Sequence, residues 1–346
     1  MKNKGRTILP TRHHCQLILL SGLVLVWSMP SLSQNWQRWT FEHAQMGTTF
    51  RIIIYGQDSL KVKAAAKAAF DRIDTLNAHM SDYIPGSELN RLSATAGTGQ
   101  KITVSEDLFR VLALGNNIAR ASDGEFDMTL GKLSLLWRRA FRQSKLPSQD
   151  QIDEVRVLQP AYLSLKLYPE QSQVLLVHPN VRLDLGGIAK GYAGDAALQL
   201  LQERGFDQVL IDAGGDLVLG EAPPGSKGWR VEIPIRFVNG GLSYQKILLK
   251  NCAIATSGDT YRYLEWEGKR YSHIISPKTG WALTDRMSVT VIARTGTVAD
   301  AWASAYSVHP WLDWPVQLSK EVGFVQRLQP NAQSQVRASG KYRKIK

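Results

Sequence analysis

The 346-residue chain has very few cysteines. It contains two, Cys15 and Cys252, and Cys15 lies in an N-terminal segment with the features of a removable leader. Without that segment Cys252 stands alone, and a single cysteine forms no intramolecular disulfide. The mature fold must therefore rest on its apolar core. A metal site built from several cysteines is excluded for the same reason.

Long apolar runs are also missing after residue 33, so the sequence predicts no stable membrane insertion of the mature chain. The first 33 residues differ, because a basic start without acidic residues is followed by an apolar run at 16–27 and small residues at 28–33. This pattern predicts a signal peptide over residues 1–33, cleaved after Ser33, and a periplasmic or otherwise exported protein. An uncleaved N-terminal anchor is the alternative. Cys15 lies at the start of the apolar run, which argues against lipid attachment.

Acidic residues are fewer than basic ones, 30 against 42, which gives a net charge of +12. Four of the positive charges lie in the predicted signal peptide and six near the C-terminus, so the rest of the chain carries about +2. No basic face interleaved with aromatic residues is found, and the sequence therefore predicts no nucleic-acid binding. Residues 34–325 are expected to form the folded domain, and residues 326–346 a solvated basic tail.

The apolar pattern predicts an α+β fold with hairpins in place of regular βαβ repeats. Helices are expected over residues 62–80, 108–119, 189–201 and from about residue 298. Strands are expected over residues 48–55, 208–211 and 288–293, with antiparallel strands between 229 and 262. The segment between Arg138 and Pro179 is polar and is expected to be irregular, with short strand-like runs such as residues 173–177.

Two glycine-rich segments follow predicted strands, at residues 183–191 (LDLGGIAKG) and 212–216 (DAGGD). Paired glycines let the backbone approach a ligand closely, and a helix N-terminus presents free N–H groups to an anion. The first segment is not a Walker A loop, because Tyr192 and Ala193 stand where Lys and Ser or Thr are required. A strand-to-helix turn and a plain hairpin also explain these glycines.

Asp300 and Ser304 are four residues apart at the start of a predicted helix, so their oxygens project from one face. Such hard oxygen ligands suit Mg²⁺. Alternatively, Asp300 only favours the helix N-terminus electrostatically. His273 precedes a Pro-Lys-Thr-Gly turn, where loops often carry function, although a buried core histidine is the other explanation.

In this order, the segments resemble the ApbE family of FAD:protein FMN transferases, from about Met46 to about Val308. The matching segments also include residues 80–90 (MSDYIPGSELN), 124–131 (GEFDMTLG), 255–259 (ATSGD) and 271–275 (YSHII). The resemblance implies an ApbE-like FAD-binding catalytic domain over residues 34–325, with mixed and antiparallel sheets packed by helices. The chain has Ser304 where the family most often has Thr, and residues 137–140 (WRRA) where Trp-Gly-Phe-Gly is common.

The resemblance also implies individual roles. Residues expected to contact FAD are Met46, Tyr83, Glu125, Phe126, Asp127, Asp184, Lys190, His273 and Ile274. The metal would be held by the side chains of Asp300 and Ser304 and by the backbone carbonyl of Gly187. His273 is the implied catalytic base, with Asp259 as its competitor.

The implied reaction moves FMN from FAD to a Thr or Ser hydroxyl of an acceptor protein, an FMN-binding domain of a redox protein, in a Mg²⁺-dependent step that releases AMP. Two alternatives stay open. With water as the acceptor, the same site would make the protein a Mg²⁺-dependent FAD pyrophosphatase that gives FMN and AMP. Without turnover, the protein would be a periplasmic FAD-binding protein.

Overall fold

The computed structural model describes residues 36–157, 160–238, 241–258, 263–308, 321–330, 335–339 and 342. They belong to one structural unit, Trp36–Lys346. The predicted signal peptide lies outside the described residues, and so does Asp259.

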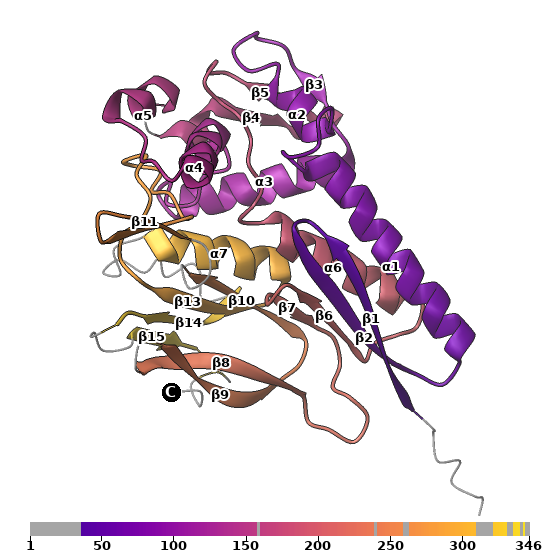
Figure 1. Ribbon diagram of the computed structural model, residues 1–346. Coiled ribbons are helices and arrows are strands. Elements are labelled where there is room, and N and C mark those ends of the chain that lie inside the picture. The colour runs from indigo at the N-terminus through magenta and orange to yellow at the C-terminus, as the bar shows by residue number, and fades with distance from the viewer. Residues whose placement is uncertain are drawn as a thin grey trace, which may run out of the picture. The chain divides into compact units, whose positions relative to one another are not determined.

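The main sheet contains eight strands among the described residues, and all of its named pairings are antiparallel (Figure 1). Across the sheet the order is β1 (Gln37–Gln45), β2 (Thr48–Gly56), β6 (Val209–Ala213), β7 (Leu217–Leu219), β10 (Cys252–Gly258), β13 (Ser288–Ala293), β14 (Val322–Leu328) and β15 (Gln335–Ala338). The strands therefore follow one another in chain order. A long insertion between β2 and β6 supplies six of the described helices, α1 to α6.

Three smaller sheets are formed by other described strands. They are β3 (Ile102–Thr103) with β5 (Gln173–Leu176) and β4 (Leu165–Tyr168), β8 (Trp229–Val238) with β9 (Gly241–Leu249), and β11 (Tyr263–Trp266) with β12 (Lys269–Ser272). The described α-helices are α1 (Ser59–Met80), α2 (Glu88–Ser93), α3 (Glu106–Ala121), α4 (Gly131–Gln143), α5 (Gln149–Val155), α6 (Ala189–Glu203) and α7 (Gly296–Val308). Two short 3₁₀ helices are η1 (Ala161–Ser164) and η2 (Pro169–Gln171).

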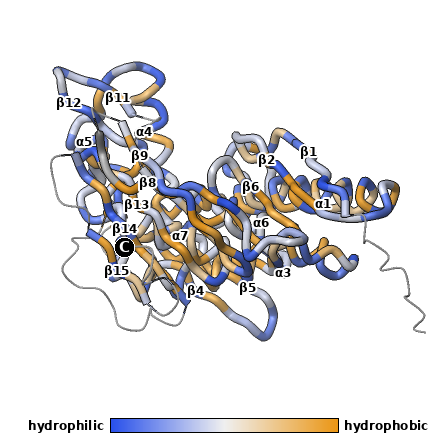
Figure 2. Tube along the Cα trace, turned by 90° about the horizontal axis from the view of Figure 1, so that it is seen from below, coloured by the Kyte–Doolittle hydropathy of each residue, from blue (hydrophilic) through white to orange (hydrophobic). Residues whose placement is uncertain are grey.

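Helices cover one face of the main sheet and the β8–β9 hairpin packs against the other (Figure 1). Strand β2 shows why both faces are apolar, because successive side chains of a strand point to opposite sides. Ile52 and Ile54 join the core under the helices, whereas Ile53 packs in the second core with Trp229 and Val231 of β8. Figure 2 shows apolar segments, in orange, gathered in the interior where α6 and α7 lie.

The α+β prediction is confirmed, and helices stand at each of the four places where apolar periodicity predicted them. The prediction of irregular structure between Arg138 and Pro179 was wrong in part, because the segment contains the end of α4, all of α5 and strand β4. The strand-like run predicted at 173–177 is confirmed as β5. Helix α4 buries Leu133, Trp137 and Ala140 on one face, and Arg138, Arg139 and Arg142 make its second half polar in sequence. Helix α5 begins at a capping box formed by Ser148 and Gln151.

Part of the segment expected to be a solvated tail belongs to the main sheet. Strand β14 runs through to Leu328, and Gln335–Ala338 pairs with it as β15. Backbone hydrogen bonds therefore hold this part of residues 326–346 in place. Within the described ranges, no helix combines the length and the apolar character that crossing a bilayer requires.

Candidate functional site

Helices α6 and α7 approach each other at their N-terminal ends, where both carry a glycine. A Cβ atom on Gly191 would collide with the carbonyl oxygen of Gly296, and one on Gly296 would lie 2.7 Å from the carbonyl oxygen of Gly191. Only residues without a side chain allow this backbone contact. It brings the start of α6 beside the segment that carries Asp300.

A partly buried ionic cluster lies at this contact. The Lys190 ammonium donates to Oδ2 of Asp216 and lies 3.7 Å from Oδ2 of Asp300, which also accepts from the Gly191 amide at 3.2 Å. Burial raises the pKa of Asp300 to about 6; Lys190 acts in the opposite direction, and Asp216 raises it further. The cluster therefore places one cation between two carboxylates in a poorly solvated position.

The loop that supplies Asp216 is fixed at both ends. The Ala213 amide donates to the carbonyl of Asp216 at 2.7 Å, and the Thr256 amide of β10 donates to Oδ1 of Asp216 at 3.1 Å. Gly214 has a φ of +74° and packs so closely on Thr48 that a Cβ atom would collide with the threonine side chain. This contact also brings the turn containing Met46 against the loop.

Gly187 lies close to Ser304, and the family resemblance assigns both residues to a metal. A Cβ atom on Gly187 would lie 2.9 Å from the Ser304 hydroxyl oxygen and 3.3 Å from the Phe126 ring. Ser304 lies one helical turn after Asp300 on α7. The three residues predicted to hold a metal thus lie in one region. No group of three or more His, Cys, Asp or Glu side chains that could hold a metal is found in the described part of the chain.

A second group of predicted residues lies around the Pro-Lys-Thr-Gly turn. The carboxylate of Glu125 is buried and accepts from the Lys278 ammonium at 2.7 Å, and this hydrogen bond raises the pKa of Lys278. The indole of Trp137 donates to the Gly280 carbonyl at 2.8 Å. Glu125, predicted to contact FAD, is therefore engaged with a residue of the same turn that follows His273.

His273 and Ile274 lie on the hairpin that leads into this turn. The Ser272 amide donates to the Leu283 carbonyl at 2.7 Å, and the Leu283 amide donates to the Ile274 carbonyl at 2.9 Å. His273 is exposed, and Ile274 is half-buried. The alternative explanation of His273 as a buried core histidine is therefore excluded. The turn after its hairpin contacts α4 through Gly280 and Trp137, and it contacts Glu125 through Lys278.

A third group contains Tyr83 and Asp184, and it depends on a residue that the sequence analysis missed. The guanidinium of Arg138 on α4 donates to Oδ2 of Asp82, donates to Oδ2 of Asp184 at 3.1 Å, and lies 4.2 Å from the centre of the Tyr83 ring. The other oxygen of Asp184 accepts from the Gly186 amide at 2.8 Å. The only signal in the sequence was the departure from the family pattern at residues 137–140.

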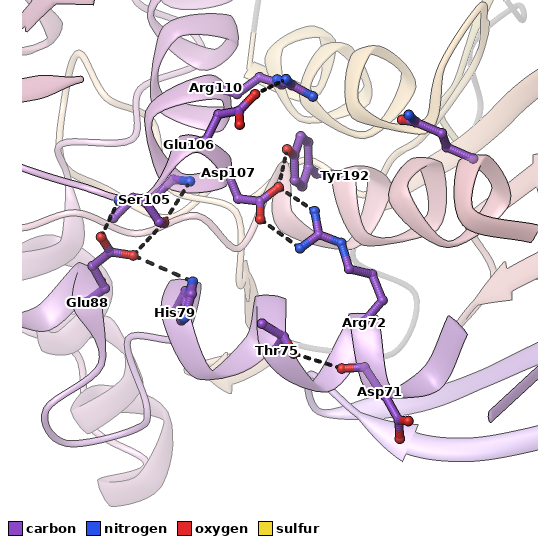
Figure 3. Close-up of polar contacts among 12 residues, drawn as sticks. Asp71, Arg72, Thr75, His79, Glu88, Ser105, Glu106, Asp107, Arg110 and Tyr192 are labelled. Carbon is purple, nitrogen blue, oxygen red and sulfur yellow. Dashed lines mark hydrogen bonds and ion pairs between the residues drawn. The ribbon is translucent and has the colours of Figure 1, made fainter. Parts of the chain in front are cut away.

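A polar network joins α6 to α1 and α3 (Figure 3). Arg72 of α1 donates twice to Asp107 of α3, at 2.7 and 2.5 Å, and the Tyr192 hydroxyl of α6 donates to the same carboxylate at 2.8 Å. Burial and this hydrogen bond raise the pKa of Tyr192, so the hydroxyl stays protonated. Because Tyr192 follows Gly191 directly, the network fixes α6 next to its contact with α7.

Asp195 of α6 caps the start of α7. It accepts from the Gly296 amide at 2.6 Å, and from the amide and hydroxyl of Thr297 at 2.8 and 2.6 Å. Replacement of Asp195 by alanine is expected to lower the free energy of unfolding by about 1–3 kcal/mol, because these donors lose their acceptor. Urea unfolding measures the change. Gln199→Ala, at an exposed position of the same helix, should stay within about 0.5 kcal/mol of wild type; an equal loss in both variants would contradict the capping role.

Asp127 makes stability depend on pH. Burial raises its pKa to about 6, against hydrogen bonds from the amide and hydroxyl of Thr129. The folded protein thus holds this proton more tightly than the unfolded chain, and the carboxylate lowers stability as the pH rises from about 4 to about 6. Asp127→Asn cannot ionise and should gain about 1–3 kcal/mol relative to wild type between these values. Unfolding curves measured at both ends of the window test this, and a constant difference between the two proteins would refute it.

The described residues form an α+β protein in which glycine-rich turns, a partly buried lysine–carboxylate cluster and hard oxygen donors surround two helix N-termini. Residues 46–343 match the ApbE family over most of the chain. The chain belongs to the ApbE family.

Known proteins agree with this assignment. A FAD:protein FMN transferase of Haemophilus influenzae is 27% identical over 304 residues, which cover 84% of this chain and 87% of that protein. A protein of the same name from Escherichia coli K12 is 30% identical over 277 residues, which cover 77% of each chain. The solved structure of the flavin transferase ApbE from Vibrio cholerae superposes with a TM-score of 0.78 at 25% identity, covering 89% of this chain and 99% of that one.

Proposed function

We propose that this protein is an enzyme that transfers FMN from FAD to a Thr or Ser hydroxyl of an acceptor protein through a phosphoester bond, with release of AMP. The observation that carries the proposal is the cluster of Lys190, Asp216 and Asp300 beside Gly187 and Ser304. The names of the relatives support the same activity, since they are FAD:protein FMN transferases.

FAD would lie along the glycine-rich turns that surround this cluster. Gly186 and Gly187 expose backbone to a ligand, and the Lys190 ammonium favours an anionic group nearby. Met46, Phe126, Asp127 and Ile274 would contact the remaining parts of the dinucleotide, together with Tyr83, Glu125, Asp184 and His273. The close packing of Phe126 on Gly187 supports a single continuous site for these residues.

The oxygen donors at Gly187, Asp300 and Ser304 fit Mg²⁺. They comprise a carboxylate, a hydroxyl and a backbone carbonyl, which are hard ligands, and substrate phosphate and water commonly complete such a site. The close approach of Gly187 to the Ser304 hydroxyl supports this set. Bound there, the metal ion would withdraw negative charge from the diphosphate oxygens. Lys190 would hold the Asp300 and Asp216 carboxylates in position.

In the proposed reaction, the acceptor hydroxyl oxygen forms a bond to the phosphorus on the FMN side. The bond from that phosphorus to the bridging oxygen breaks, and AMP leaves with this oxygen. The hydroxyl proton passes to a base. His273 is the proposed base because it is exposed on its hairpin and an imidazole nitrogen can accept a proton. Asp259 is kept as the competing base and lies outside the described residues.

The acceptor is proposed to be an FMN-binding domain of a redox protein. We also propose that a signal peptide at residues 1–33 directs export of the chain and that the catalytic domain begins at residue 34. They are supported by the basic, apolar and small-residue pattern of the N-terminal sequence.

Incubation of the purified protein with FAD, Mg²⁺ and an FMN-acceptor domain tests the proposal. Intact-mass measurement should show the acceptor heavier by one FMN phosphoester, with AMP released in equal amount. An acceptor whose target Thr is replaced by Val serves as the control and should gain no mass. AMP release without any mass gain would instead identify a FAD pyrophosphatase. If neither product forms, the proposed function is wrong.

A further inference from the structure

We propose that Arg138 is a positioning residue that locks the loop carrying Tyr83 onto the Asp184 turn and thereby fixes the Tyr83 ring for FAD. This inference rests on the proposed function, because it assumes that Tyr83 and Asp184 contact the dinucleotide. It assigns a role to a side chain on α4 for which no function is predicted from the sequence.

The contacts of Arg138 join three segments that are distant in the sequence. From α4, its guanidinium bonds to Asp82 of the loop after α1 and to Asp184 of the turn before α6. The Asp82 and Asp184 side chains are 7% and 17% exposed, so both ion pairs are shielded from solvent. A planar guanidinium can hold two carboxylates at once, which the compact ammonium of lysine does less well.

Without this cation the two carboxylates would oppose each other. Burial raises the pKa of Asp82 and the neighbouring charge of Asp184 raises it further, whereas Arg138 and, less strongly, Arg182 act in the opposite direction. Removal of Arg138 would therefore leave two shielded negative charges facing each other across the contact, and the loop would separate from the turn.

The cation–π contact orients the Tyr83 ring itself. The guanidinium carbon lies 4.2 Å from the ring centre, so Arg138 covers one face of the ring. Tyr83 nevertheless remains 71% exposed. The opposite face is therefore open to a planar ring, and Arg138 supports the tyrosine from behind. A ring held in one orientation loses little conformational entropy when a ligand stacks on it.

Fluorescence titration with FAD in the presence of Mg²⁺ tests this role. Arg138→Met keeps helix propensity and most of the side-chain length, and should weaken FAD binding about fivefold to thirtyfold. Arg138→Lys keeps the charge but loses the forked geometry and should fall between Met and wild type. Arg139→Met makes the same change at the adjacent, exposed position of α4 and should bind FAD as wild type does.

A double-mutant cycle with Tyr83→Leu separates positioning of the Tyr83 ring by Arg138 from a general loss of structure. If Arg138 acts through Tyr83, Arg138→Met should weaken binding at least about threefold less in the Tyr83→Leu background than in wild type. Full additivity of the two effects would overturn the inference, as would wild-type FAD affinity in Arg138→Met. Thermal unfolding shows whether each variant is folded; if Arg138→Met is not, the cycle is run with Arg138→Lys. Failure of the wild-type protein to bind FAD would instead refute the proposed function.

Discussion

Replacement of Asp300 by asparagine is expected to lower kcat/KM for FMN transfer by about 10²- to 10³-fold. Asn has nearly the same shape but carries no charge, so it neither pairs with Lys190 nor serves as an anionic ligand for Mg²⁺. Initial rates of acceptor flavinylation, followed by intact mass, measure the effect. The variant should stay folded, because burial raises the pKa of Asp300 to about 6 and therefore disfavours its charged form in the folded protein.

The matched control for this prediction is Asp71→Asn. Asp71 lies on the surface of α1, with its side chain 58% exposed and paired with Lys67, and an exposed ion pair of this kind contributes little. The control should transfer FMN at the wild-type rate. Asp300→Asn with undiminished activity would show that this carboxylate takes no part in the reaction.

Replacement of Gly191 by alanine is expected to lower the free energy of unfolding by at least about 3 kcal/mol. The new methyl group would collide with the backbone carbonyl of Gly296, and backbone on both sides leaves no flexible side chain to move away. The helices must therefore separate, which also displaces Asp300 from the Gly191 amide. Chemical denaturation of both proteins measures the loss.

Gln202→Ala provides the control on the same helix, at an exposed position, and should change stability by less than about 0.5 kcal/mol. A Gly191→Ala protein within about 1 kcal/mol of wild type would mean that the two helices can move apart at little cost. The close contact between α6 and α7 would then not be what holds the site residues in position.

Local patterns in the sequence were sufficient to predict the elements that bury one regular stripe. The apolar positions of α1 recur every three or four residues, and the structure buries them as Val62, Ala66, Ala69, Ile73, Leu76 and Met80. Helix α4 has the same spacing at Leu133, Leu136, Trp137 and Ala140, but the charged residues of its second half favoured an irregular segment from Arg138 onward. Strand β15 could not be found this way, since its residues alternate between exposed and half-buried and are held in the sheet by pairing with β14.

The candidate site was predictable only where its residues lie in short motifs. The resemblance to the ApbE family assigned roles to Gly187, Lys190 and Asp300, which lie in a glycine-rich turn and at a helix start. Their partners depend on contacts between segments far apart in the chain, such as the pair of Lys190 with Asp216 and the bonds of Arg138 to Asp82 and Asp184. Sequence spacing contains no information on such contacts, because the tertiary fold decides which loops meet.

Calorimetric titration of the full chain with FAD, with Mg²⁺ present and again with the metal removed by a chelator, tests the central claim most directly. If a divalent ion is held beside Lys190 and Asp300, FAD should bind saturably when Mg²⁺ is present and much more weakly without it. An absence of FAD binding in saturating Mg²⁺ would contradict the assignment of this cluster as the place where the diphosphate of FAD is held.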